Sequence, residues 1–162
     1  MSLQDKLQVE AIRNGTVIDH IPSPIGFDIL RFLKLENSNK RMTVGINLPS
    51  SNMKTKDIIK IENVFLPENK ANQLALFSQN ITINQIKDFT VIKKYKIILP
   101  RDVLGIFSCP NPNCITNHEK VRSYFKVTHH NDNTLLKCHY CEKSYQKKII
   151  TQINYKDTKW IL

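Results

Sequence analysis

Several residue types and patterns are scarce in this chain, and each absence excludes some kinds of protein. The first 108 residues contain no cysteine, so we expect a metal-free N-terminal part. No apolar run approaches the roughly 20 residues that a membrane-spanning helix needs. Glycine and proline number only 4 and 7, with no repeat or low-complexity tract, which suits a globular chain. The opening stretch MSLQDKLQVE lacks an apolar export segment, so we expect the chain to stay in the reducing cytoplasm.

Cysteine is concentrated in two close pairs, Cys109-x4-Cys114 and Cys138-x2-Cys141, separated by 23 residues. A hairpin between the pairs can bring all four thiolates to one point, and Zn²⁺ accepts four thiolates tetrahedrally. We therefore predict one structural zinc ion per chain. Iron in the same cage is the minor competitor. Two disulfides are the other alternative, which a reducing compartment disfavours.

Signatures of catalysis are also missing. No GxSxG, HExxH or GxxxxGK[ST] motif occurs, and a zinc ion with four thiolate ligands has no position for water or substrate. A thiol redox function fails because the zinc would occupy every thiolate. We therefore expect no enzyme. Four histidines lie in the cysteine-containing last third of the chain: His118, His129, His130 and His139. We expect them in solvated loops; the alternative is that one of them replaces a cysteine as a metal ligand.

The net charge of +10 first suggests a nucleic-acid partner. The positive excess is divided evenly between residues 1–100 and 101–162, and four thiolates around one Zn²⁺ reduce it in the second part. A charge spread so evenly is mostly a solvated surface, compatible with a small polyanion. A zinc-ribbon nucleic-acid-binding protein is the rival hypothesis. The Cys109-x4-Cys114 spacing with two prolines differs from the usual C-x2-C knuckle of such ribbons.

The first 99 residues alternate strand and helix patterns. Apolar residues at every second position predict strands, and apolar residues along one helical face predict helices. Pro67 followed by Glu68 is typical of a first helical turn. The order matches the split βαβ, ferredoxin-like plan, an antiparallel sheet with two helices on one face. The predicted elements are strands at 7–12 and 16–21, a helix at 25–35, strands at 41–48 and 57–65, a helix from 67, and strands at 82–83 and 89–98.

The last third predicts a small β domain. Brief strands are expected at 107, 124–127, 134–137 and 149–150, with a polar hairpin tip at 129–133. About 60 residues bury little apolar surface, so the metal is expected to decide whether this domain folds. The fold class is therefore α+β: a ferredoxin-like domain at 1–99, an all-β zinc domain of the rubredoxin-like kind at 100–153, and a tail at 154–162.

Polar residues of the first part suit a nucleotide. An Asp can accept both ribose hydroxyls, ammonium groups can neutralise phosphates, and main-chain groups can bind a base edge. Each lysine, taken alone, is more simply a solvated surface charge, so composition does not justify the site.

The motifs LQVEAIRNGTVIDHIP, GINLPS, KDIIKIENVFL, NQLAL and CPNPNC…KCHYCEK occur in this order between about residues 6 and 150. Together they resemble the regulatory chain of aspartate carbamoyltransferase, an enzyme of pyrimidine biosynthesis. VIDHIP and KIEN, combined with the four-cysteine ending, make this resemblance highly specific.

The resemblance implies a non-catalytic allosteric subunit. Its first domain would bind nucleoside triphosphate effectors of the CTP and ATP type and pair regulatory chains into homodimers. Its second domain would hold zinc through the four cysteines and dock on catalytic chains, linking two catalytic trimers. No membrane and no nucleic acid is expected as a partner. Residues matching the effector pocket are Val9, Glu10, Ile12, Val17, Asp19, His20, Lys56, Lys60, Asn84, Ile86, Phe89, Val91 and Lys94.

Particular roles follow from the same resemblance. Asp19 would hold the ribose, Lys94 and His20 the phosphates, and Lys60 the base or phosphates. The backbone near residues 12 and 89 would bind the base. Two features depart from the family: Phe89 stands where relatives often carry Tyr, and residues 154–162, with Trp160, extend beyond the usual end.

Overall fold

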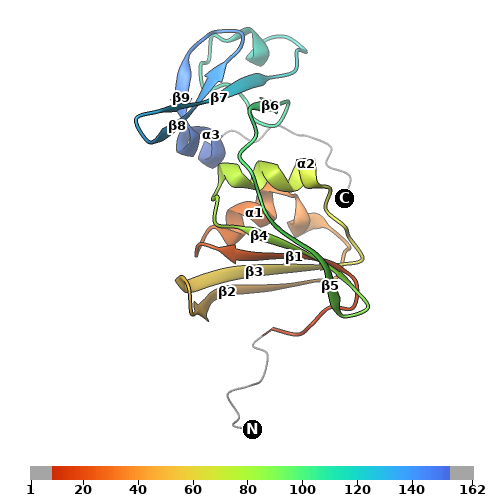
Figure 1. The fold of residues 1–162 in the computed structure, drawn as a ribbon. Helices are drawn as coiled ribbons and strands as arrows, with labels where there is room; N and C mark the ends of the chain where they lie inside the picture. Colours follow the sequence, from red (N-terminus) through yellow and green to blue (C-terminus); the bar gives the residue numbers. More distant parts are fainter. Residues whose placement is uncertain (1–8, 154–162) are drawn as a thin grey trace.

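The N-terminal part of the chain is a five-stranded sheet with helices on one face (Figure 1). The computed structural model describes residues 9–153. Every neighbouring pair of strands is antiparallel, in the order β2-β3-β1-β4-β5. The strands are β1 Gly15–Ile21, β2 Met42–Ser50, β3 Lys54–Glu62, β4 Thr82–Lys87 and β5 Thr90–Lys96. The helices are α1 Gly26–Phe32, η2 Leu35–Asn37, α2 Glu68–Ala71 and the 3₁₀ continuation η3 Asn72–Leu76.

Strand alternation builds the core between the sheet and the helices. Ile18, Ile59 and Ile83 come from three adjacent strands and are fully buried, as are Ile29 of α1 and Leu74 of η3. Successive strand residues point to opposite faces, so the intervening residues line the other face of the sheet. The predicted ferredoxin-like plan is confirmed, with β5 as an additional edge strand formed by a hairpin with β4.

Several predicted element boundaries were wrong. Residues 9–12 lie in no strand, and residues 7 and 8 of that predicted strand lie outside the described part. The predicted helix at 25–35 stops at Phe32, because Lys34 adopts a left-handed conformation (φ 53°) before η2. The last predicted strand begins only at Thr90, since Asp88 and Phe89 form the turn of the β4–β5 hairpin with positive φ values.

The C-terminal part is a four-stranded antiparallel sheet in the order β6-β7-β8-β9. The predicted strand at 149–150 is wrong: both residues lie in helix α3, whose Ile150 is fully buried while Ile149 is exposed. Alternation of one buried and one exposed residue does not distinguish a strand from a short helix. The elements are β6 Asp102–Leu104, η4 Ile115–Asn117, β7 Tyr124–His130, β8 Asn133–Cys138, β9 Ser144–Gln146 and α3 Lys147–Ile153.

The two parts share one buried core. The ring of Phe32, at the end of α1, stacks on Phe107 of the C-terminal part with centroids 6.0 Å apart. The helices α1 and α2 lie between the N-terminal sheet and the C-terminal sheet (Figure 1). The other face of the N-terminal sheet therefore points away from the C-terminal part. Within residues 9–153, no helix is both long and apolar enough to cross a membrane.

Candidate functional site

The four cysteine sulfurs form one compact cluster, in which every Sγ lies within 4.8 Å of the others. The Sγ atoms of Cys109 and Cys141 are 3.7 Å apart, and those of Cys114 and Cys138 are 3.8 Å apart. These separations exceed the roughly 2.05 Å of a disulfide bond. Four thiolates arranged tetrahedrally about 2.3 Å from a Zn²⁺ ion lie about 3.8 Å from one another. The donor set therefore fits a single tetrahedral metal ion.

Backbone and side-chain hydrogen bonds fix the two cysteine loops. Asn117 donates its side-chain amide to the carbonyl oxygens of Cys109 and Asn111, at 2.9 and 2.8 Å. In the second loop, the backbone N–H of Cys138 donates to the carbonyl of Lys143 at 2.9 Å. These contacts fix the backbone of both loops that carry the cysteines.

The thiols differ in how readily they ionise. Burial raises the pKa of Cys109 and that of Cys138. Burial also opposes ionisation of Cys141, but hydrogen bonds, first among them one from the backbone of Lys143, outweigh it and lower its pKa to about 7. Three of the four cysteines are buried, and Cys141 is partly exposed. Four sulfur donors leave no open coordination position, so the arrangement suits structural rather than catalytic metal binding.

The second group of predicted site residues lies on the sheet face opposite the helices. Strand register aligns Lys60 of β3, Val17 of β1, Asn84 of β4 and Lys94 of β5 in one row across four strands. Paired residues of antiparallel strands project to the same face, so these side chains share one surface. The register also pairs Ile86 with Val91 beside this row.

Asp19 is the acidic centre of this face. Its Oδ1 atom accepts a hydrogen bond from Lys56 Nζ at 2.8 Å and one from the backbone N–H of His20 at 2.6 Å. Burial raises the pKa of Asp19, but the Lys56 and His20 interactions outweigh this and lower its pKa overall. A β-bulge between Ile18 and Ile21, with His20 at φ 56°, interrupts the pairing with β3 at this point. Such bulges often redirect side chains next to functional sites.

Lys60 attaches the segment before β1 to the same face. Its Nζ atom donates to the carbonyl oxygens of Val9 and Glu10 at 3.2 and 2.8 Å. Desolvation lowers the pKa of Lys60. Because these carbonyls bind a lysine rather than a neighbouring strand, the predicted strand does not form at residues 9–12. Ile12 is nevertheless buried, in a small apolar cluster with Val17, Ile58 and Ile86.

Two buried polar atoms on this face lack a hydrogen-bond partner within the described part of the chain. They are Nδ1 of His20 and Oδ1 of Asn84. Buried polar atoms are nearly always hydrogen-bonded, so each exception requires an explanation. A polar ligand lying on this face would supply the missing partners.

Sequence reasoning missed several residues of a cavity that adjoins this face. A cavity of about 390 Å³ contains His20 and Lys94 and extends along Asn52, Met53, Asn80, Thr82 and Lys96. The register pairs Thr82 with both Asp19 and Lys96. The period-two spacing of Lys94 and Lys96 was the available signal, since it places both ammonium groups on one face of β5.

Phe89 lies at the margin of the predicted set. It stands in the hairpin turn, its side chain is 67% exposed, and its backbone N–H already donates to the carbonyl of Arg13 at 2.9 Å. This N–H is therefore unavailable to a base in this structure. Glu10, Val91 and Lys94 are also exposed, whereas the rest of the predicted set is at least partly buried.

The fold and the two groups of residues define a class: a two-domain protein with a four-cysteine cluster suited to a metal ion and a polar face on its N-terminal sheet. Comparison with known families specifies this class further. Residues 7–98 match the model of the aspartate carbamoyltransferase regulatory chain, allosteric domain. Residues 101–151 match the model of the metal-binding domain of the same regulatory chain.

Individual relatives agree with the family models. The aspartate carbamoyltransferase regulatory chain of Photobacterium profundum is 51% identical over 154 residues, covering 95% of this chain and 100% of the relative. The same-named chain of Vibrio cholerae is 49% identical over 153 residues, covering 94% and 99%. That of Aliivibrio fischeri is 47% identical over 154 residues, covering 95% and 100%.

This chain belongs to the family of aspartate carbamoyltransferase regulatory chains. It carries the allosteric and the metal-binding domain of that family and is a regulatory rather than a catalytic chain. The expectation of a non-enzymatic chain is confirmed by this membership, and the zinc-ribbon nucleic-acid-binding hypothesis loses its support.

Proposed function

We propose that the chain is the allosteric subunit of a cytoplasmic aspartate carbamoyltransferase in pyrimidine biosynthesis. It binds nucleoside triphosphates of the CTP and ATP type on the exposed face of its N-terminal sheet. The observation that carries this proposal is the unpartnered pair of buried atoms, His20 Nδ1 and Asn84 Oδ1, on a face that also presents Asp19 and several lysines. That combination suits a ligand with both hydroxyl and phosphate groups.

Each part of the nucleotide has a candidate partner. Asp19 accepts the ribose hydroxyls, Lys94 and His20 bind phosphates, and Lys60 contacts the base or the phosphates. The cavity supports the addition of Lys96 to the phosphate end, because it lies beside His20 and Lys94. Base recognition falls to the backbone near Ile12 and Phe89, apart from the Phe89 N–H, which already donates to Arg13. The remaining residues form the walls: Val9, Glu10, Val17, Lys56, Asn84, Ile86 and Val91.

Ribose binding changes the partners of Asp19. Its Oδ1 atom is held by Lys56 and by the His20 N–H, so a ribose hydroxyl has to share or displace the Lys56 contact. Asp57, which follows Lys56 in β3, points to the opposite face of the sheet. It accepts a hydrogen bond from the backbone N–H of Gly26 at the start of α1, at 2.9 Å. A shift of β3 at this point therefore moves α1 as well.

Helix α1 continues the connection to the C-terminal domain. Its last residue, Phe32, stacks on Phe107, so movement of α1 changes the contact between the two domains. An effector alters the assembly only if it binds the alternative arrangements with different affinity, typically by about 1–3 kcal/mol. Pyrimidine and purine triphosphates oppose one another by competing for one pocket while favouring different arrangements.

We propose zinc as the metal held by Cys109, Cys114, Cys138 and Cys141, one ion per chain. The four-sulfur donor set and the sulfur–sulfur separations support it. In this proposal residues 1–99 form the nucleotide-binding and dimerisation domain, and residues 100–153 form the zinc domain that docks on the catalytic chain. The predicted tail, residues 154–162, lies outside the described part of the chain. Docking through three regulatory dimers links two catalytic trimers.

The open edge of β2 is the proposed site of homodimer formation. The sheet has two edge strands, β2 and β5. β5 carries Lys93, Lys94 and Lys96, and lysines on an edge strand discourage pairing with another sheet. β2 contains no charged residue from Met42 to Ser50, so its edge is free to pair with that of a second copy.

Replacement of Lys94 by alanine tests the nucleotide site. We expect the Lys94→Ala chain to bind CTP and ATP at least about tenfold more weakly in calorimetric titration, because a charge-assisted hydrogen bond contributes about 1.5–3 kcal/mol. Metal content and assembly with catalytic chains should not change. Lys93→Ala is the matched control, since Lys93 pairs with Glu68 at 2.8 Å instead. Equal affinity in both variants would remove Lys94 from the site.

Reconstitution tests the regulatory function itself. The zinc-loaded chain is mixed with its cognate catalytic trimers, and carbamoyl transfer to aspartate is assayed with and without each nucleotide. We expect the rate at subsaturating aspartate to change with nucleotide only when the regulatory chain is present. A nucleotide response of the trimers alone, or none in the mixture, would contradict the proposal.

A further inference from the structure

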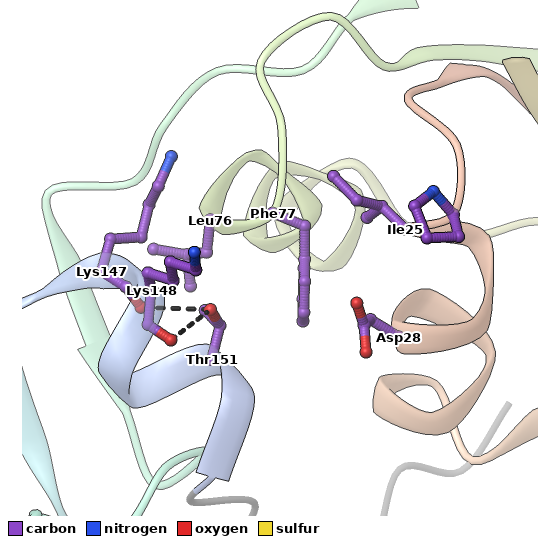
Figure 2. A pocket seen from close by; sticks show the side chains of 8 residues that line it. Ile25, Asp28, Leu76, Phe77, Lys147, Lys148 and Thr151 are labelled. Atoms are coloured by element: carbon purple, nitrogen blue, oxygen red, sulfur yellow. Dashed lines mark hydrogen bonds between the residues drawn. The ribbon is translucent and has the colours of Figure 1, made fainter. Parts of the chain in front are cut away.

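A cleft of about 440 Å³ separates the two domains on the helical side of the molecule, away from the proposed nucleotide face. Figure 2 shows its walls: Lys147, Lys148 and Thr151 come from α3, and Ile25 and Asp28 from the region of α1. Leu76 and Phe77 project between these walls from the end of η3. The volume lies within the range of small-molecule sites, roughly 300–1,000 Å³.

The centre of the cleft is apolar and rigidly built. The Phe77 ring contacts Phe32 edge-to-face, with centroids 5.2 Å apart, and Leu76 beside it is buried. Ile25 and Phe77 are only partly buried, so their remaining surface faces the cleft and can cover an apolar ligand.

One wall carries two lysines, Lys147 and Lys148. Among the described residues, neither Lys147 nor Lys148 forms an ion pair. Lys147 is partly buried, and this desolvation lowers the pKa of its ammonium group. Asp28, on the opposite wall, is paired with Arg31 of its own helix at 3.6 Å. A half-buried ammonium group next to an apolar surface favours an anion that is itself partly apolar.

We propose that this interdomain cleft binds a small amphipathic carboxylate. Its ring-sized apolar body lies against Phe77, Leu76 and Ile25, and its carboxylate accepts hydrogen bonds from Lys147 and Lys148. The site is separate from the nucleotide face and does not depend on nucleotide binding. Since its walls belong to different domains, an occupant holds them at a fixed spacing and changes any motion between them.

Titration of the full-length metal-loaded chain with 3-phenylpropionate tests the site. We expect saturable shifts of backbone NMR signals in α1, η3 and α3, and none on the proposed nucleotide face. The uncharged analogue 3-phenylpropionamide should bind at least about tenfold more weakly, because it loses the charge-assisted hydrogen bonds. Equal binding of the acid and the amide, unsaturable shifts, or shifts centred elsewhere would overturn the proposal.

Two double variants test whether Lys147 and Lys148 bind the carboxylate of the ligand. Lys147→Met/Lys148→Met keeps much of the aliphatic length and should lose the preference for the acid over the amide. The control Lys126→Met/Lys137→Met removes two lysines from β7 and β8, whose register pairs them with each other, and should keep that preference. An unchanged preference in the first variant would overturn the proposal. Strong binding that appears only after deletion of residues 154–162 would also overturn it, because the cleft would then belong to the tail.

Discussion

Lys56 and Asp57 are consecutive residues of β3 that point to opposite faces of the sheet. Lys56 pairs with Asp19 on the proposed nucleotide face, whereas Asp57 is fully buried beneath α1. The two carboxylates differ in their partners: an ammonium group and one backbone N–H hold Asp19, whereas two backbone N–H groups hold Asp57. Strand alternation thus places the ion pair of the proposed nucleotide face directly beside a buried structural contact.

The first prediction concerns the ionisation of Asp19. Replacing Lys56 by Met should raise the pKa of Asp19 toward or above its usual value of about 3.9, since burial would then act with less opposition. A lowered pKa in the folded chain stabilises it above the unfolded-state pKa, and this stability is lost as the pH falls through the folded-state pKa. In the Lys56→Met chain this acid-dependent loss of stability should shrink or vanish, because the folded-state pKa of Asp19 then approaches or exceeds the unfolded-state value.

An NMR titration of the Asp19 side-chain carbon measures this pKa directly in both chains. Glu68 is the internal reference, because its contact with Lys93 is unaffected by the substitution. An identical titration midpoint for Asp19 in both chains would show that Lys56 does not govern it.

At the scale of elements, the sequence predicted best where alternation and helical periodicity extend over several residues. The strand β1 and the order of the N-terminal elements were foreseen, as was the Pro67–Glu68 start of α2. The failures have local physical causes. Lys60 captures the carbonyls of Val9 and Glu10, a contact across 50 or more residues that no local pattern encodes.

For the two candidate sites as well, local sequence patterns predicted one part and missed another. Cysteine spacing alone predicted the cluster, because short loops limit where four sulfurs can lie. The nucleotide set needed the family resemblance, since its members come from four strands and their alignment depends on register. Thr82 was missed because only the pairing of β1 with β4 brings it beside Asp19, and Lys96 because its spacing from Lys94 does not reveal that it pairs with Thr82.

The second prediction concerns the connection between β3, β2 and α1. The two carboxylate oxygens of Asp57 accept N–H groups of Gly26 and Asn47, at 2.9 and 2.8 Å. Asp57→Ala leaves both without this partner, at a cost of about 1–3 kcal/mol for each buried group. We expect the free energy of unfolding in urea to fall by at least about 2 kcal/mol.

Asp88→Ala is the control for this loss. Asp88 pairs with Arg13 at 3.3 Å on the surface, and both side chains are at least two-thirds exposed. An exposed ion pair contributes about 1 kcal/mol or less. If Asp57→Ala were no more destabilising than Asp88→Ala, the hydrogen bonds to Asp57 would not contribute to the stability of the contact between β3 and α1.

At the scale of the whole molecule, the metal and the shared core determine how the two domains depend on each other. Small domains without enough apolar core often rely on a bound metal, and structural zinc contributes roughly 10–16 kcal/mol in small peptides. The stacking of Phe32 on Phe107 extends this dependence to the N-terminal domain. Loss of the metal should therefore weaken one contact of α1 as well.

The third prediction follows for metal removal. Complete chelation should unfold the C-terminal domain, collapse its backbone NMR signals to random-coil positions and abolish its near-ultraviolet circular dichroism. The N-terminal sheet should stay folded, with reduced protection near Phe32. Readdition of zinc should restore the original spectrum. Native-like signals for β7 and β8 in the fully metal-free chain would contradict the prediction.

The uncharged edge of β2 has a consequence for the size to which an assembly of sheets can grow. When two copies pair along β2, each uses its one uncharged edge strand. The combined sheet then ends on both sides in the lysine-bearing β5. A third copy then meets only β5 edges, whose lysines discourage pairing with another strand. In the proposed homodimer, growth of the combined sheet would therefore stop at two copies, and the outermost strand β5 would prevent open-ended fibres.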